Sequence, residues 1–470
     1  MTAIEHVAPR AWRETVAQAL LRGERFGGAW ASGRDGSLAW RALLTSSQGE
    51  RVISCQANER QVESIVDLVE AAGWDEREAH DLYDMAFPGH SPLRALAAHP
   101  EDPAQWMTPV TGDGVHQVAV GPIHAGVIES GHFRFHVVGE RILAVDPRLF
   151  YKHRGLERAA EGSDSEQALK YAQRACGACS VSNTLAYAHA VEDALALRPD
   201  RELRVNRTVL LELERLYNHL HDIGAICAGV GFAPGSMAFA ALKDRAQQVN
   251  QRAFGHRFLF GSVCVGRGAV ELDASSTDSA RGAIRELHAD AAAAWRELEF
   301  AGSVQARLDG VGVLSHSDAQ RLGAVGPAAR AAGIREDARD ASPRLAYDSF
   351  TLASPTAPAG DVAARLRMRA IELESTCELL EDLLRQPLAP GTTTGGGAAA
   401  TTLGVGTVES PRGATMCAVE LDGARVARLR LRTGSYANWP ALAHAAADNL
   451  LPDFPLINKS FELCYACVDR

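Results

Sequence analysis

The sequence predicts an α+β fold, in which a small N-terminal α/β domain precedes a mainly helical domain with a small peripheral sheet. Three observations predict it. The first hundred residues mix strand-like and helical patterns, and long stretches of helical periodicity follow from residue 165. At 470 residues the chain is also too long for one ordinary core. We therefore expect two domains, residues 1–109 and 110–470.

The N-terminal domain is predicted from short segments of different periodicity. Residues 12–21 and 59–72 repeat their apolar side chains at helical spacing. Residues 38–44 and 51–55, which lie between them, are typical of strands. A proline-rich stretch that ends at Pro109 indicates the linker to the second domain.

The second domain begins with a short sheet and continues with long helices. Alternation predicts strands over residues 118–120 and 132–145. Helices are predicted over residues 165–195, 202–229, 238–257, 276–300, 315–332 and 360–385. A Gly/Thr/Ala-rich loop over 387–404, strands over 405–408 and 419–432, and a helix over 439–450 complete the prediction.

Composition excludes some functions. Hydrophobic residues at 46% and charged residues at 23% are typical of a soluble globular protein. The net charge of −10 argues against nucleic acid as a partner, because phosphate binding needs a basic face. The sequence has no apolar run long enough to span a bilayer and no recognisable signal peptide at its start, so we expect a cytoplasmic location.

Cysteines give the first functional signal. Five of the nine are isolated, and we expect them to be buried core thiols: Cys55, Cys227, Cys264, Cys377 and Cys417. The other four form two C-x-x-C pairs, Cys176/Cys179 and Cys464/Cys467, whose soft thiolates suit zinc, iron–sulfur or nickel. Zinc ribbons usually place their pairs about 15–20 residues apart, whereas about 285 residues separate these two. A zinc site and unrelated thiols stay open as alternatives.

The segments around both pairs resemble a known family. R-A-C-G-A-C at 174–179 resembles the R-x-C-G-x-C motif of nickel–iron hydrogenase large subunits, and E-L-C-Y-A-C at 462–467 resembles their C-terminal D-P-C-x-x-C motif. The motifs G-P-I-H-A-G, G-H-F-R-F and F-Y-K-H-R-G-L-E, at 121–126, 131–135 and 150–157, resemble the membrane-associated, energy-converting branch. That branch includes formate hydrogenlyase and is related to the 49-kilodalton subunit of respiratory complex I. W-D-E-R-E at 74–78 and G-H-S-P-L-R at 89–94 are similar to the 30-kilodalton-type subunit of complex I.

The resemblance implies a nickel–iron centre bound by all four cysteines. Cys179 and Cys467 would bridge nickel to an iron carrying carbon monoxide and cyanide, and Cys176 and Cys464 would be terminal ligands of nickel. The resemblance also leaves room for a magnesium ion. It implies no iron–sulfur cluster in this chain, since too few cysteines remain to bind one.

Two further motifs imply residues that serve the metal centre. Glu129, in I-E-S-G-H, resembles a family glutamate that passes protons from a terminal cysteine, although a solvated turn glutamate is the alternative. E-S-P-R-G at 409–413 resembles the family's E-x-P-R-G motif, which assigns Pro411 and Arg412 to cofactor binding. Arg412 would overhang the iron's diatomic ligands, since a guanidinium donates hydrogen bonds without titrating; a surface arginine is the alternative.

Several other polar residues are weaker candidates. Five of them lie on the helices predicted after the first cysteine pair: Glu192, Glu212, Glu214, His219 and His221. A buried histidine with an ordinary hydrogen-bond partner is the commoner outcome at such positions. His124 resembles a position near the complex I quinone pocket. Ion pairs are expected for Arg154 with Glu157 and for Asp361 with Arg365. Asn183, Asn218 and Glu462 depart from the usual family residues.

The first functional hypothesis is an energy-converting hydrogenase that interconverts protons and hydrogen. The resemblance implies as partners an iron–sulfur small subunit, membrane antiporter-like subunits and nickel-insertion maturation proteins. It also implies a peripheral position on the cytoplasmic side of the membrane. The second hypothesis is a nickel-free complex I-like subunit, associated with NAD and quinone binding. The third is a structural docking subunit whose cysteines bind zinc.

Overall fold

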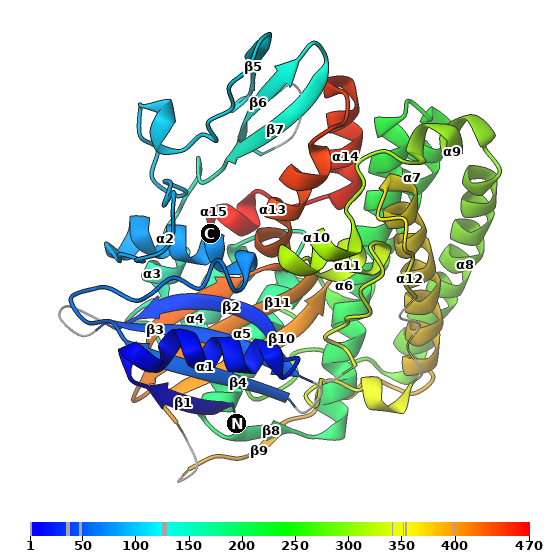
Figure 1. Ribbon diagram of the computed structural model, residues 1–470. Coiled ribbons are helices and arrows are strands. Elements are labelled where there is room, and N and C mark those ends of the chain that lie inside the picture. Colours follow the sequence, from blue (N-terminus) through cyan, green and yellow to red (C-terminus); the bar gives the residue numbers. More distant parts are fainter. Residues whose placement is uncertain are drawn as a thin grey trace.

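The computed structural model describes residues 2–33, 38–46, 49–124, 129–340, 342–350, 352, 355–397 and 401–470, and it has the α+β fold predicted from the sequence (Figure 1). Long helices occupy one side of the molecule, and small sheets occupy the other (Figure 1). In the part of the chain that is described, no helix combines the length and apolar character that crossing a membrane requires.

The N-terminal α/β unit, Ala3–Tyr83, is built on a four-stranded sheet of order β1-β4-β3-β2. Its elements are β1 (Ala3–Val7), α1 (Trp12–Leu21), β2 (Arg25–Ser32), β3 (Ala39–Ser46), β4 (Gly49–Gln56) and α2 (Gly73–Tyr83). β1 pairs parallel with β4, and the other pairs are antiparallel. α1 covers the sheet because its buried residues Trp12, Val16 and Ala19 recur at helical spacing.

The predicted helix over 59–72 is wrong. Only a short 3-10 turn, Glu70–Ala72, lies in that range, and the helix α2 follows it. Glu76 of α2 accepts hydrogen bonds from the Ile65 amide (2.9 Å) and the Ser64 hydroxyl (2.7 Å). These contacts satisfy polar groups of the segment from outside, so the backbone does not need its own helical bonds. β1 and β2 were not predicted.

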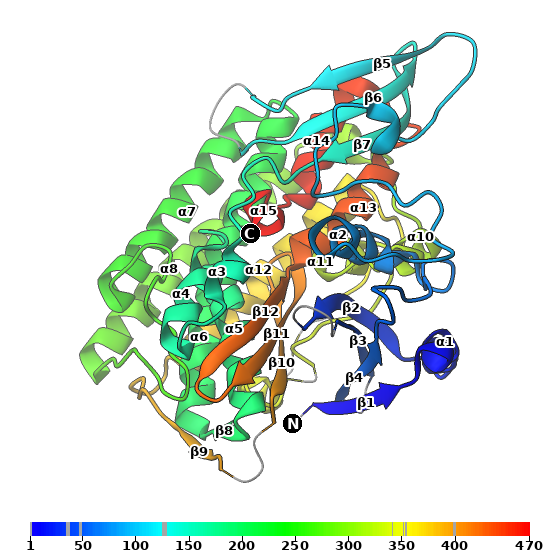
Figure 2. The same cartoon turned by 90° about the vertical axis from the view of Figure 1, so that its left-hand side faces the viewer.

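Two three-stranded antiparallel sheets follow. The peripheral sheet consists of β5 (Val115–Val120), β6 (His132–Val138) and β7 (Arg141–Arg148). The central sheet consists of β10 (Leu403–Ser410), β11 (Gly413–Asp422) and β12 (Arg425–Arg432). The central sheet lies between the N-terminal sheet and the helices (Figure 2), and Trp30, Leu43, Val405 and Met416 form part of a shared core with the N-terminal sheet.

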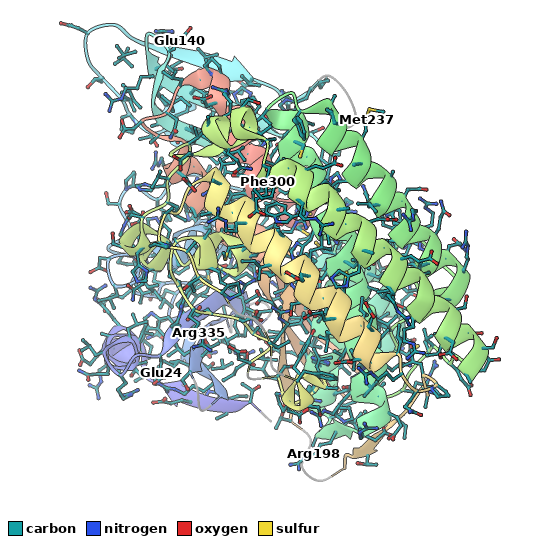
Figure 3. The ribbon with its side chains drawn as sticks, turned by 90° about the vertical axis from the view of Figure 1, so that its right-hand side faces the viewer. Glu24, Glu140, Arg198, Met237, Phe300 and Arg335 are labelled. Atoms are coloured by element: carbon teal, nitrogen blue, oxygen red, sulfur yellow. The ribbon has the colours of Figure 1, made fainter. Side chains whose placement is uncertain are left out.

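The helices surround this sheet and form a bundle beside it. They are α3 (Leu156–Ala160), α4 (Ser165–Arg174), α5 (Ser180–Ala194), α6 (Arg201–Gly229), α7 (Ala233–Phe254), α8 (Ala274–Glu299), α9 (Gly302–Leu308), α10 (His316–Arg321), α11 (Gly326–Ala331), α12 (Val362–Leu383), α13 (Gly434–Ala446), α14 (Phe454–Phe461) and α15 (Ala466–Asp469). α6, α7, α8 and α12 run side by side (Figures 1 and 3).

Two predicted helices are divided in the structure. The stretch 165–195 is broken at the first cysteine pair, between α4 and α5, and 315–332 is broken between α10 and α11. The predicted loop 387–404 contains the short strand β9 (Thr393–Gly395), which pairs with β8 (Leu197–Pro199), and the first residues of β10.

Candidate metal centre

The four cysteines of the two C-x-x-C pairs meet at one place. Cys176 and Cys179 lie in the turn between α4 and α5, and Cys464 and Cys467 lie around the break between α14 and α15. Their Sγ atoms all lie within 4.8 Å of one another, and 3.8 Å separates those of Cys179 and Cys464. Four thiols this close, brought from distant parts of the chain, can bind a single soft metal site.

Helix α6 shapes the turn of the first pair. The Glu214 carboxylate accepts hydrogen bonds from the amides of Val181 (2.6 Å) and Ser182 (3.0 Å) at the start of α5. The Tyr217 hydroxyl (3.0 Å) and the Asn218 amide (2.8 Å) both donate to the carbonyl of Ala178. Glu214 and Asn218 therefore fix the backbone between and after the two cysteines.

Burial gives Glu214 a pKa near neutrality. Desolvation raises the pKa of its carboxyl to about 7, although the two backbone amides oppose that shift. The folded chain therefore holds this proton more tightly than the unfolded chain does. The resulting contribution to stability is complete below about pH 4.5 and is lost as the pH rises through about 7.

The second pair is held by side chains from several elements. The Cys464 amide donates to the Ser435 hydroxyl (3.0 Å), and the Ala466 amide donates to the Glu129 carboxylate (2.7 Å). Partial desolvation, together with the charges of Cys464 and Asp469, raises the pKa of Glu129. The structure thus places Glu129 beside the second pair, in contact with the backbone between its two cysteines.

Arg154 connects the segments that carry the two pairs. Its guanidinium donates to the carbonyls of Arg174 (3.0 Å) and Ala175 (2.8 Å), which precede Cys176, and to that of Ala466 (3.4 Å). The predicted ion pair between Arg154 and Glu157 is therefore wrong. The guanidinium points to backbone carbonyls, and Glu157 pairs with arginines from the C-terminal part of the chain.

The thiols share hydrogen bonds among themselves. Such bonds from Cys179, Cys464 and Cys467 lower the pKa of Cys176 well below its usual value. The bonds raise the pKa of Cys179 and Cys467. The bond with Cys176 opposes the shift, but bonds from Cys179 and Cys467 lower the pKa of Cys464 as well. The thiolate is the metal-binding form of cysteine, so a cluster that lowers the pKa of two of its thiols is suited to a cation.

Arg412 is buried beside the cysteines, in the turn between β10 and β11. Its Nε donates to the carbonyl of Glu462 (2.8 Å), and its Nη2 donates to the Asp222 carboxylate (2.9 Å). Burial opposes its charge, but Asp222 and the sulfurs of Cys464 and Cys179 keep the pKa of Arg412 above its usual value. The buried Nη1 has no hydrogen-bond partner among the described residues.

That buried donor provides a test of whether the site fits a nickel–iron centre. An unsatisfied N–H costs free energy unless an acceptor completes it. Nitrogen-ended cyanide on a metal held by the cysteines is such an acceptor, and four thiolates are a donor set that nickel accepts. Pro411 is buried in the same turn. The residues present therefore fit the group that the sequence predicted.

Sequence reasoning missed the charges behind Arg412. Asp222 also accepts from Arg369 Nε (3.0 Å), and Arg369 donates to the carbonyl of Phe461 (3.0 Å) just before the second pair. His219, predicted as a candidate, contacts Glu372 (2.9 Å) and no cysteine. The one feature of the sequence that could have indicated these buried charges is the apolar stripe of α6, which is interrupted by charged residues.

The remaining candidates have structural partners. Glu192 pairs with Arg207, Glu212 accepts from Tyr347 and Thr376, and His221 lies 3.2 Å from Glu462. His124 contacts the carbonyl of Gly131 (2.7 Å), while residues 125 and 126 of its motif lie outside the described residues. Both side-chain amide atoms of Asn183 are buried without a partner in the described part of the chain.

The predicted ion pair between Asp361 and Arg365 is also wrong. Asp361 accepts from the Ala364 amide (2.8 Å) and caps the start of α12. The Arg365 guanidinium donates instead to Gly360, Gly312 and Ser460. A helix cap competes successfully with a charge pair here because the amides at a helix start have no other partners.

A separate cavity of about 940 Å³ opens between the N-terminal unit and the rest of the chain. Arg198 and Arg335, labelled in Figure 3, line it together with the buried carboxylates of Asp337 and Glu409. None of the four cysteines lines this cavity. The metal centre is therefore a distinct site.

Fold and site together define a subunit of the class shared by nickel-dependent hydrogenases and respiratory complex I. The family described as "Respiratory-chain NADH dehydrogenase, 49 Kd subunit" matches residues 230–394 and 391–470. The corresponding 30 Kd subunit family matches residues 8–113, and the family "Nickel-dependent hydrogenase" matches residues 154–223.

Individual relatives show which members of this class the chain is similar to. Hydrogenase-4 component G of Escherichia coli is 30% identical, over 88% of this chain and 77% of that protein. Formate hydrogenlyase subunit 5 of the same organism is 28% identical, over 89% of this chain and 78% of that protein. A subunit of the archaeal membrane-bound sulfane sulfur reductase, a respiratory membrane complex, shares the fold with a TM-score of 0.70 at 23% identity, over 77% of this chain and 100% of that one.

The chain belongs to the family of hydrogenase-4 and formate hydrogenlyase-type subunits, in which a 30-kilodalton-type segment precedes a hydrogenase and complex I 49-kilodalton-type segment. NADH-quinone oxidoreductase subunits D, such as that of Salinispora arenicola at 30% identity, are also related to it. The family resemblance predicted from the motifs is confirmed, and the protein is an oxidoreductase subunit of the hydrogenase and complex I type.

Proposed function

We propose that this chain is the catalytic subunit of an energy-converting [NiFe] hydrogenase that interconverts protons and H2. The observation that carries the proposal is the meeting of four cysteine sulfurs within 4.8 Å. A complex I-like subunit that only binds quinone has no need of four converging thiols. The match of the nickel-dependent hydrogenase family to the segment with the first pair supports the same proposal.

The proposed roles are those that the family resemblance implies, and the convergence of the four sulfurs supports them. Cys176 and Cys464 would be terminal ligands of nickel, and Cys179 and Cys467 would also bind iron. When bound, a nickel–iron centre with carbon monoxide and cyanide supplies the redox chemistry that makes and splits H2. Arg412 would donate its free Nη1 to a ligand of iron, with Pro411 beside it. Glu129 would accept and release protons at the Cys464 side of the cluster.

The proposed assembly rests on the relatives. Electrons would pass to or from an iron–sulfur small subunit, since this chain has no second cluster of cysteines in its described residues. Antiporter-like subunits would attach the complex peripherally to the cytoplasmic side of a membrane. Maturation proteins would insert nickel. One of the relatives is described as a membrane-bound hydrogenase subunit, from Pyrococcus furiosus.

Metal analysis of the purified complex tests the proposed function. We expect about one nickel per chain, and infrared bands of metal-bound carbon monoxide and cyanide, since the four thiolates are arranged for one soft site. The second candidate is a nickel-free complex I-like oxidoreductase subunit, favoured by the related subunits D. Zinc in place of nickel, or no metal and no infrared bands, would contradict the hydrogenase proposal.

A glutamine at position 129 tests the proton route. Glu129→Gln keeps an acceptor for the Ala466 amide but cannot carry a proton, so we expect H2 turnover to fall at least about 100-fold. Nickel content and the infrared bands should not change. Glu140→Gln, at an exposed turn of the peripheral sheet (Figure 3), is the control and should keep full turnover. If Glu129→Gln keeps its turnover as well, another group relays the proton.

A further inference from the structure

The N-terminal α/β unit meets the rest of the chain through a buried set of charges. Every second residue of β12 from position 428 onward is an arginine: Arg428, Arg430 and Arg432. Asp75 and Glu78, one helical turn apart on α2, face them. Asp75 accepts from Arg430 (2.9 Å) and Arg432 (3.0 Å), and Glu78 pairs with Arg430. All five side chains are buried.

Arg470 joins the same set from the segment of the second cysteine pair. Its Nη2 donates to both oxygens of Glu78 (2.7 and 2.8 Å), and its Nε donates to Glu157 (2.7 Å). Its guanidinium lies over the ring of Tyr436, 4.8 Å from the centroid. Only 2% of Arg470 is exposed. Glu78, in the N-terminal unit, therefore contacts a residue that lies only three positions after Cys467.

The segment that carries Cys467 has little secondary structure of its own. α15 is four residues long, Ala466–Asp469, and a helix this short has no independent stability. Contacts from elsewhere must hold it. Besides the Arg470 contacts, they include Glu129 and the Arg154 guanidinium at Ala466, the Thr433 hydroxyl at the Cys467 carbonyl (3.5 Å), and the Arg154 amide at the Asp469 carbonyl (3.2 Å).

We propose that Glu78 is a positioning residue of the metal centre, through which the N-terminal α/β unit holds Arg470 and thereby keeps Cys464 and Cys467 beside Cys176 and Cys179. Glu78→Gln removes the carboxylate that accepts two hydrogen bonds from Arg470 Nη2, so Arg470 keeps only Glu157 as an ionised partner. A buried cation that loses one of its two partners is disfavoured, so Arg470 moves toward water and draws the short α15 with it.

The charges of Glu78 and Glu157 support this role. Burial alone would raise the pKa of Glu78, but Arg430 and Arg470 lower it to about 2. Those arginines, with Arg428, also lower the pKa of Glu157 against the effect of burial. Both carboxylates are therefore ionised at neutral pH, and Arg470 is attracted by each of them.

Thiol trapping on the reduced, metal-free full-length chain tests the proposal without activity. An alkylating reagent is added, and mass spectrometry follows each cysteine over time. In Glu78→Gln we expect Cys464 and Cys467 to react about tenfold faster than in the wild type, which needs only ~1.4 kcal/mol of easier local opening. Cys176 and Cys179 should change less than about twofold, because α6 holds their turn.

Asp75→Asn is the matched control. Asp75 lies on the same helix and pairs with arginines of the same strand, but it does not contact Arg470. It should leave the reactivity of Cys464 and Cys467 near that of the wild type. Arg470→Gln should have at least the effect of Glu78→Gln, because it removes the contact with Glu78 and also the one with Glu157. The double variant should add nothing to Arg470→Gln, since that variant already lacks the Glu78 contact. Arg470→Gln also keeps the test decisive if Glu78→Gln does not fold.

Equal reactivity in Glu78→Gln and Asp75→Asn, or an increase at all four cysteines together, would overturn the proposal, because either would show a general loss of docking. The part of this proposal that concerns the metal-bound protein rests on the proposed function. In nickel-loaded protein, Glu78→Gln should shift the carbon monoxide band, while Asp75→Asn should not. A wild type without nickel or bands would refute the hydrogenase proposal and leave the trapping result standing.

Discussion

A serine at position 467 should abolish both metal binding and hydrogen turnover. Cys467 is fully buried within the four-sulfur cluster, and a hydroxyl is a much poorer ligand for nickel than a thiolate. In Cys467→Ser we expect nickel to fall below about a tenth of the wild-type content, with no detectable H2 turnover. The reason is that every ligand contributes to the affinity of the site for the metal. Elemental analysis and a hydrogen electrode would measure both.

A buried cysteine elsewhere provides the control for that variant. Cys227 is equally buried in α6 and belongs to the apolar core. Cys227→Ser loses some packing but no ligand, so it should keep its nickel and its turnover. If Cys467→Ser retained a full complement of nickel, the four-cysteine site would not be the metal centre.

Lysine at position 412 should retain the metal and lose most of the turnover. Lysine keeps the positive charge but cannot keep the bonds to Glu462 and Asp222 and also offer a third, unpartnered donor, as Arg412 does with its Nη1. Loss of one preorganised donor at a reacting centre costs about 10²–10³ in kcat. We therefore expect a loss of this size for Arg412→Lys, with nickel near the wild-type level.

Infrared spectroscopy separates this role from a structural one. If Nη1 contacts a ligand of iron, the cyanide bands should shift in Arg412→Lys. Arg425→Lys, on the exposed end of β12, should leave both turnover and bands unchanged. Wild-type turnover in Arg412→Lys would show that Arg412 serves only to hold Asp222 and the second cysteine pair.

Local sequence was most informative where function depends on a few ligands in fixed spacing. Each C-x-x-C pair is a local pattern, and the E-S-P-R-G turn is another, so both could be recognised without the fold. Helices such as α6 and α12 were also predicted, because their apolar residues repeat over many turns. The helix predicted over 59–72 failed because Glu76, from the next element, satisfies that segment's polar groups.

The partners of charged residues were beyond the reach of sequence. The i, i+3 spacing of Arg154 and Glu157 and the i, i+4 spacing of Asp361 and Arg365 suggested ion pairs, yet neither ion pair forms. Arg412 is held by Asp222, 190 residues away, and Arg470 by Glu78, 392 residues away. A buried charge pairs with the opposite charge that folding brings close to it, and the spacing of residues along the sequence does not predict which one that is.

The sequence by itself determined which four cysteines are candidate soft ligands, which arginine is a candidate to accompany them, and the α+β class of the chain. Only the tertiary structure decided that the four sulfurs converge, that Arg412 keeps one buried donor without a partner among the described residues, and that Glu78 of the N-terminal unit contacts Arg470, three residues from Cys467. The physical reason is that ligand type is a property of single residues. Ligand geometry depends on buried contacts between segments hundreds of residues apart, which form only when the whole core has packed.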